Sequence, residues 1–215
     1  MFFRIKPLEF LISLGRTDIS EAINKILFIV EKCENPRLKG LCFLIKSDRS
    51  LTVIASNGFR LVAISFPGVV IRSPGRYAFF IHLDQIPIFV SRLQSGPVSF
   101  SIVGERLVFS DGYKINCLPN SPLSSYEAII PKLEGYQFSI QREEIERFQD
   151  PTNSELLVFP FDGSSKKVTV YKEFFLDAFK VLGDRLRVSI KGDEDPILIK
   201  GEDKNIIYLL MAIIK

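Results

Sequence analysis

The sequence predicts an α+β fold in which one unit, a helix accompanied by several strands, recurs along the chain. Stretches of alternating apolar residues, typical of strands, are interrupted by segments whose apolar residues have helical spacing. The order strand, helix, strands occurs twice before residue 119 and again near the end of the chain. Each such unit leaves sheet edges, so we expect neighbouring units to pair through them.

The first repeat is expected to begin with an edge strand within residues 2–14, where Pro7 is tolerated. A helix capped by Thr17 or Asp18 follows, and Glu21 completes a capping-box spacing. Strands are then expected at 38–46, 51–56 and 59–66. The helix positions expected to face a core are Ile19, Ala22, Ile23, Ile26, Val30 and Cys33.

The second repeat begins with an expected strand at 77–81. A helix runs from His82 or Asp84 to Leu93 and places Pro87 in its first turn, where the missing N–H costs little. The strands expected after it are 97–103, 105–110 and 112–118. Residues 119–135 are rich in proline and serine and are expected to form a linker.

The remaining residues predict a second, shorter domain, so the expected domains are 1–132 and 133–215. A strand at 136–140, a short charged helix at 141–149, a strand at 155–161 and an Asp162-Gly163 turn come first. A third repeat follows, with strands at 167–170, 187–190, 196–199 and 206–213 around a helix at 171–182. Its expected buried face carries Tyr171, Phe174, Phe175, Ala178 and Leu182. Compared with the first domain, a pair of strands is missing.

Composition indicates a globular protein. The chain has 215 residues, 47% of them hydrophobic, which is enough to bury a core. Its net charge of +3 is small and therefore predicts neither nucleic-acid binding nor membrane binding. Cys33, Cys42 and Cys117 have no metal-type spacing and are expected to be small core residues of a reducing compartment. We find no signal peptide and no membrane-length apolar run, which predicts a cytoplasmic protein.

The residues that catalysis needs are scarce. His82 is the only histidine, no glycine-rich phosphate loop is present, and acidic pairs such as Glu143-Glu144 are typical of solvated surfaces. We therefore expect no enzyme, no cofactor and no metal site. An enzyme that uses a groove between the domains would need a polar cluster near His82, which the sequence does not show.

Residues 51–61 carry the most informative pattern. Apolar alternation from Leu51 to Ser56 predicts a strand, Asn57-Gly58 predicts a tight turn, and a second strand follows from Phe59. This places Arg60 just past the turn, at the rim of a sheet.

Three stretches together resemble the bacterial sliding clamp family, the beta subunit of DNA polymerase III. Ile54-Ala-Ser-Asn-Gly-Phe-Arg-Leu61 is similar to an Ala-Thr-Asp-Gly-His-Arg-Leu motif of the clamp's middle domain. Tyr126-Glu-Ala-Ile-Ile-Pro131 is similar to the run that closes that domain. The segments 171–182, 195–199 and 208–211 resemble the helix and strands that end the clamp's last domain.

The resemblance implies two clamp-like domains, each with an antiparallel sheet and with helices on one face. It also implies a non-catalytic processivity factor that encircles duplex DNA without reading its sequence and tethers polymerases and other proteins with a clamp-binding motif, with a clamp loader as a further partner. Clamp rings of this family contain six domains, so a trimer is the expected homo-oligomer. The alternative is a clamp-derived interaction protein, of mobile-element or phage type, that binds replication proteins without encircling DNA.

The resemblance also implies a pocket for an apolar, glutamine-bearing peptide. An apolar cleft with a few polar groups suits such an anchor; the same residues could instead be core at a domain boundary. The implied pocket residues are Leu38, Ser56, Gly58, Phe59, Arg60, Leu61, Ile129, Pro196, Leu209 and Met211.

In clamps, the helices line the DNA, and phosphate contacts of this kind need cationic side chains. The implied DNA-facing residues share their helices with many acidic residues, so ordinary solvated faces remain an equal alternative. They are Lys25, Lys32, Arg92, Arg142, Arg147, Lys172 and Lys180.

Several positions depart from the family's pattern and predict an altered pocket. Phe59 stands where the family has histidine, Ser124-Ser125 stands where the family has Pro-Asp before the tyrosine, and Ala128 replaces an arginine. Ala212 interrupts the usual Met-Pro-Met ending.

Overall fold

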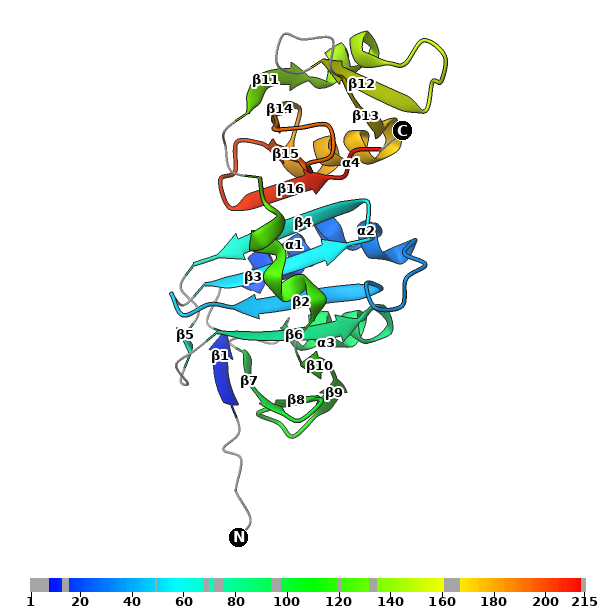
Figure 1. Ribbon diagram of the computed structural model, residues 1–215. Helices are drawn as coiled ribbons and strands as arrows, with labels where there is room; N and C mark the ends of the chain where they lie inside the picture. Colours follow the sequence, from blue (N-terminus) through cyan, green and yellow to red (C-terminus); the bar gives the residue numbers. More distant parts are fainter. Residues whose placement is uncertain are drawn as a thin grey trace. The chain divides into compact units, whose positions relative to one another are not determined.

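The computed structural model describes residues 8–12, 16–48, 50–67, 70–71, 76–93, 98–119, 121–131, 135–160 and 167–213. The chain forms two compact units (Figure 1). The first unit comprises Met1–Ala55 and Ile64–Ser124, and the second comprises Ser56–Ala63 and Ser125–Lys215. The turn that follows Ser56 therefore belongs to the second unit, although both sequence segments around it belong to the first.

One sheet of the first unit has the order β5-β1-β7-β8-β9. Its strands are β1 (Leu8–Ile12), β5 (Val70–Ile71), β7 (Val98–Val103), β8 (Arg106–Phe109) and β9 (Lys114–Asn116). β1 is antiparallel to β7 along its whole length and to β5 at two positions, so the expectation of an edge strand is wrong. The reason is that the connection after β4 (Arg60–Phe66) contains β5, which pairs with the other side of β1.

The second sheet of the first unit contains β10 (Leu118–Pro119), β6 (Tyr77–His82), β2 (Gly40–Ile45) and β3 (Leu51–Ser56), in that order. β2 lies antiparallel between β3 and β6. Every residue of β2 and β3 is buried. The alternation of apolar and polar residues along β3 therefore does not mark one solvent-exposed face and one buried face. Thr52 meets this burial by a hydrogen bond between its hydroxyl and that of Ser65, at 3.0 Å.

The helices of the first unit are α1 (Arg16–Ile26), α2 (Phe28–Glu31) and α3 (Ile86–Leu93), with the 3₁₀ turn η1 (Leu83–Gln85) before α3. α1 begins at Arg16, so the predicted cap at Thr17 or Asp18 is wrong. The predicted core face is confirmed, because the six positions named for it are buried. A cluster of phenylalanine rings fills the core between helix and strands: Phe43, Phe79, Phe89, Phe100 and Phe109.

The three cysteines are buried free thiols, as the sequence predicted. Burial raises the pKa of Cys42 to about 12 and that of Cys117 to about 11. Both therefore remain protonated at neutral pH and behave as small apolar residues.

In the second unit, the first residues of β4 (Arg60–Phe66) are followed across the sheet by β16 (Ile206–Leu210), β15 (Ile197–Lys200), β14 (Arg185–Ile190) and β11 (Tyr136–Gln141). β12 (Leu156–Pro160) and β13 (Lys167–Tyr171) form a separate antiparallel pair. α4 (Lys172–Leu182) packs against β13, β14 and β16 and ends at Gly183, whose φ of 93° suits glycine.

Two segments of the second unit are 3₁₀ helices. η3 (Arg142–Phe148) lies where a short charged helix was expected at 141–149, and it buries only Ile145, too little apolar surface to support a longer helix. η2 (Pro122–Ile129) lies within the predicted linker. The predicted Asp162-Gly163 turn lies outside the described residues.

The two units share one pairing scheme. β1 pairs with β7 and β2 with β6 in the first unit, as β11 pairs with β14 and β12 with β13 in the second. In chain order, β3, β4 and β5 lie between β2 and β6, whereas only residues 161–166 separate β12 from β13. The second unit is therefore the shortened one, and the fold is α+β with antiparallel sheets.

No helix in the described ranges has both the length and the apolar character needed to cross a lipid bilayer.

Candidate functional site

The turn from Ser56 to Arg60 is closed by its own polar groups. Asn57 Oδ1 accepts hydrogen bonds from the backbone N–H groups of Phe59 and Arg60, both at 3.1 Å, and Gly58 has a φ of 95°. The Ser56 hydroxyl donates to the carbonyl of Arg60 at 2.9 Å and accepts from the N–H of Gly58. The sequence folds this way because asparagine bonds its own backbone and glycine tolerates positive φ.

Arg60 extends from this turn into the interior of the second unit, where only 3% of its surface is exposed. Its guanidinium forms an ion pair with the carboxylate of Asp177 on α4 and lies 4.6 Å above the centre of the Phe174 ring. Tyr208 on β16 adds a hydrogen bond to the guanidinium, and its hydroxyl donates to the carbonyl of Phe174 at 2.6 Å. The turn is thereby fixed to both α4 and β16.

Burial acts on the pKa values of this network in opposite directions. Desolvation lowers the pKa of Arg60, opposed by Tyr208 and Glu173, and raises the pKa of Tyr208. Arginine nevertheless stays protonated in proteins, so a buried guanidinium requires a compensating negative charge. Asp177, with 2% of its surface exposed, supplies that charge.

Phe59 points outward from the fixed turn, with 53% of its surface exposed. Its ring centre lies 5.7 Å from that of Phe174, nearly parallel, and 6.2 Å from that of Tyr171, edge to face. Its carbonyl accepts a hydrogen bond from the N–H of Met211 at 2.8 Å. Phe59, Tyr171, Phe174 and Met211 form what we call the aromatic surface, a set of partly exposed apolar side chains on a rigid base.

The structure places the pocket residues implied by the resemblance in different environments. Phe59 and Met211 lie together on the aromatic surface, with Arg60 directly beneath it. Gly58 shapes the turn, while Ser56, Leu61 and Leu209 are buried in the second unit. Ile129, 48% exposed, and the half-buried Pro196 lie on other segments of that unit, and Leu38 is half-buried in the first unit.

Sequence reasoning missed several residues of this site. Tyr171 and Phe174 were expected on the buried face of a helix, yet Tyr171 is 40% exposed and Phe174 is half-buried. Asp177 is one of the acidic residues that share a helix with the implied DNA-facing cations, and it is buried, although a solvated face was the alternative for such helices. The available signal was its position on the apolar face of the helix, three residues after Phe174 and four before Val181.

Most of the cations implied to face DNA have acidic partners within their own unit. Arg92 pairs with Asp111 and stacks 4.1 Å from the Tyr113 ring centre. The other ion pairs are Arg142 with Asp184 at 3.9 Å, Arg147 with Glu144 at 3.1 Å, Lys172 with Glu146 at 2.9 Å and Lys180 with Asp177 at 2.6 Å. Lys25 and Lys32 are exposed at α1 and just after α2. The helices thus present little uncompensated positive charge.

Among the residues that the structure describes, no three His, Cys, Asp or Glu side chains gather in a group that could hold a metal ion. His82 ends β6 and packs edge to face on Phe80 at 5.2 Å. It takes part in a local aromatic contact of the first unit.

No family model and no curated protein matches the sequence. The structure is similar to bacterial DNA polymerase sliding clamps. The DNA polymerase III subunit beta from Pseudomonas aeruginosa superposes over 100% of this chain with a TM-score of 0.72 and 16% identity. A Helicobacter pylori beta clamp bound to a DNA ligase peptide superposes over 100% with a TM-score of 0.72 and 18% identity. A sliding clamp from Bacillus subtilis superposes over 100% of this chain with a TM-score of 0.68 and 18% identity.

These matches cover 69%, 68% and 66% of the three clamps, so the chain spans about two thirds of their length. The fold of this chain is that of the bacterial sliding clamps in a shortened form.

Proposed function

We propose that this protein is a clamp-like processivity factor that tethers replication proteins by binding a short apolar peptide at the aromatic surface. The observation that carries the proposal is Phe59, a large apolar side chain held exposed by a turn that is fixed from both sides. Aromatic anchors on a rigid base are typical of peptide-binding hot spots, because little conformational entropy is lost on binding.

The position of the aromatic surface supports the same function. It is built by the turn after β3, the start of α4 and the residue after β16, which belong to the stretches 54–61, 171–182 and 208–211 through which the sequence resembles the sliding clamps. One of the similar structures is a clamp bound to a DNA ligase peptide. We therefore expect the partner segment to be apolar with few charges and to pack its side chains on Phe59, Tyr171 and Met211.

On DNA, we propose that the chain acts as a closed ring, a homotrimer with two units from each protomer. Since most of the implied DNA-facing cations already have acidic partners, retention on DNA would be topological and would depend little on affinity. Lys25 is the cation of that set that we expect to contribute most to contacts with phosphates. Neither a cofactor nor a catalytic step belongs to this function.

Peptide binding is tested by fluorescence anisotropy with a labelled peptide that carries one glutamine and two large apolar residues. The variant Phe59→Ala should weaken binding about tenfold or more, because it removes the central anchor. Tyr136→Ala is the matched control, since Tyr136 is an aromatic residue of the same unit, 42% exposed on β11. Equal effects of the two substitutions, or none from Phe59→Ala, would contradict the proposed site.

Ring formation is tested by sedimentation and by retention on circular DNA before and after linearisation. A trimer that stays on closed circles and leaves linear DNA is the expected result. A chain that remains monomeric at high concentration would rule out the ring.

The internal pairing of the helix cations favours one alternative, a clamp-derived protein that binds replication proteins without encircling DNA. In that case, the peptide would bind with the same dependence on Phe59, and retention would not depend on whether the DNA is circular. The two measurements together separate the functions.

A further inference from the structure

A second charged surface lies on the sheet of the second unit. Arg185, Arg187, Lys200 and Lys204, which we call the cationic sheet face, line one surface hollow of about 510 Å³. Along β14, Leu186 and Val188 are buried while Arg185 and Arg187 are exposed. Because α4 packs against β14 and neighbouring side chains of a strand point to opposite sides, the arginines lie on the face that α4 leaves open.

The arrangement concentrates like charges. Arg187 on β14 is directly opposite Lys200 on β15 in the antiparallel register, so both side chains project from the same face. Arg185 lies two residues from Arg187 on the same side. Like charges placed directly across from each other destabilise a sheet. This feature works against folding, so it calls for a role outside folding.

The cations of this face differ from those of the helices in their partners. Among the residues that the structure describes, none of the four members has an acidic side chain within ion-pair distance, and Glu202 is the one carboxylate that lines the hollow. By contrast, Arg142, Arg147, Lys172 and Lys180 of the same unit are all ion-paired. The four cations of the sheet face are therefore uncompensated, unlike these four cations of the same unit.

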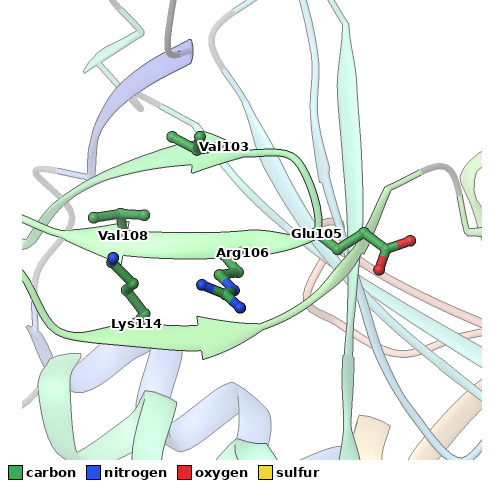
Figure 2. Close-up of a pocket in the computed structure, with 5 residues that line it drawn as sticks. All are labelled: Val103, Glu105, Arg106, Val108 and Lys114. Carbon is green, nitrogen blue, oxygen red and sulfur yellow. The ribbon is translucent and has the colours of Figure 1, made fainter.

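The first unit also has cations on two neighbouring strands of the equivalent set. β7, β8 and β9 follow α3 as β14, β15 and β16 follow α4, and a hollow of about 400 Å³ over them is lined by Arg106 and Lys114. Figure 2 shows these two side chains beside each other at β8 and β9, with the carboxylate of Glu105 pointing away from them. Two neighbouring cations on the exposed face of adjacent strands thus occur in both units.

We propose that the cationic sheet face binds the phosphate backbone of nucleic acid, and that Arg106 and Lys114 form a second, smaller contact of the same kind. The lining of the larger hollow contains no aromatic residue, and its only apolar side chain, Leu186, is fully buried. A protein partner would need an apolar or aromatic anchor, which this surface does not offer. Contacts through charge alone are typical of phosphate binding without sequence preference. This surface is distinct from the aromatic surface and does not depend on ring formation.

The test measures the affinity of the full chain for labelled single-stranded and duplex oligonucleotides over a range of salt concentrations. The sheet variant combines Arg185→Gln, Arg187→Gln, Lys200→Gln and Lys204→Gln. The control removes the same charge elsewhere through Arg37→Gln, Lys39→Gln, Lys46→Gln and Lys167→Gln, which lie outside both hollows. Peptide binding at the aromatic surface is measured in parallel and reports that each variant is folded.

The sheet variant should bind oligonucleotides about tenfold or more weakly than the control. Its slope of log affinity against log salt should become less negative by about 3.6 for duplex DNA, because each of four lost phosphate contacts contributes about 0.9. Equal losses in the two variants, or unchanged binding by the sheet variant, would overturn the proposal. A labelled poly-glutamate peptide serves as a second probe. If it binds as tightly as the oligonucleotide and needs the same four residues, the assignment to nucleic acid is overturned. A failure of ring formation with oligonucleotide binding intact would refute the ring alone.

Discussion

Arg60 and Asp177 form an ion pair in the interior of the second unit, with 3% of each side chain exposed. They are far apart in the sequence, one just after a tight turn and the other in the middle of α4. This pair, together with the Phe174 ring and the Tyr208 hydroxyl, determines where the turn lies and hence where Phe59 is presented. Predictions about stability and binding follow from this connection.

Removing one partner of the pair should be strongly destabilising. Asp177→Ala leaves a charged guanidinium buried without its counter-charge, and we expect the free energy of unfolding to fall by about 3–5 kcal/mol in urea denaturation. Asp111→Ala is the control, because it breaks the partly exposed pair with Arg92. There the expected loss is about 1 kcal/mol or less. Similar losses in the two variants would show that the buried pair has no special role.

Replacing both partners with apolar residues should separate stability from function. Arg60→Met combined with Asp177→Leu removes both buried charges, and such exchanges are often neutral or stabilising. The turn would then lose its charged attachment to α4, so Phe59 would be held less firmly. We expect the free energy of unfolding to lie within about 1–2 kcal/mol of that of the parent protein. The peptide should bind several-fold more weakly. Unchanged peptide affinity would mean that the ion pair does not position Phe59.

Stability should decrease in alkaline solution. The pKa values of Cys42 and Cys117 are raised from 9.0 to about 12 and about 11, so the folded state holds protons that the unfolded state releases above about pH 9. This contribution is fully present below pH 9 and is lost as pH rises toward 11 and 12, at up to about 1.4 kcal/mol per pH unit for each thiol. Urea denaturation between pH 8 and 11 measures it. The double variant Cys42→Ala and Cys117→Ala should have a shallower pH dependence, and an unchanged slope would contradict this account.

Reversing one charge of the sheet face should stabilise the second unit. Lys200→Glu places a carboxylate directly opposite Arg187 and replaces repulsion with attraction, so we expect a gain of about 0.2–1 kcal/mol in thermal or urea unfolding. Lys204→Glu changes the same charge at the turn after β15, outside the β14–β15 register, and serves as the control with little or no gain. Both should weaken oligonucleotide binding. Stabilisation by Lys204→Glu alone would argue against the cross-strand repulsion.

Local patterns predicted the elements of this fold well. Helical spacing identified the buried side of α1, and Asn57-Gly58 identified the turn, because both depend on residues near each other in the chain. Pairing was predicted less well: β1 was expected at an edge and is covered by β5, a strand of two residues that is too short to leave a periodic pattern. The predicted cap of α1 was wrong because the helix begins at Arg16, before the residues expected to cap it.

The candidate site could be predicted only in part. The resemblance pointed to Phe59, Arg60 and Met211, which the structure brings together. It did not distinguish the buried Asp177 from the exposed acidic residues of the helices, because the sequence does not show which charged residues form ion pairs. The residue-by-residue assignment of the peptide pocket and of the DNA-facing cations remains a prediction that the binding experiments above address.

The sequence by itself determined the α+β unit, its repetition and the tight turn, because these follow from hydrophobic period and backbone preference over a few residues. Only the tertiary structure decided which charges are neutralised. It buried Asp177 against Arg60, paired most helix cations with acids, and placed Arg187 across from Lys200 on an open sheet face. The physical reason is that electrostatic energy depends on distance and burial between side chains that are remote in sequence, and chain folding alone fixes both.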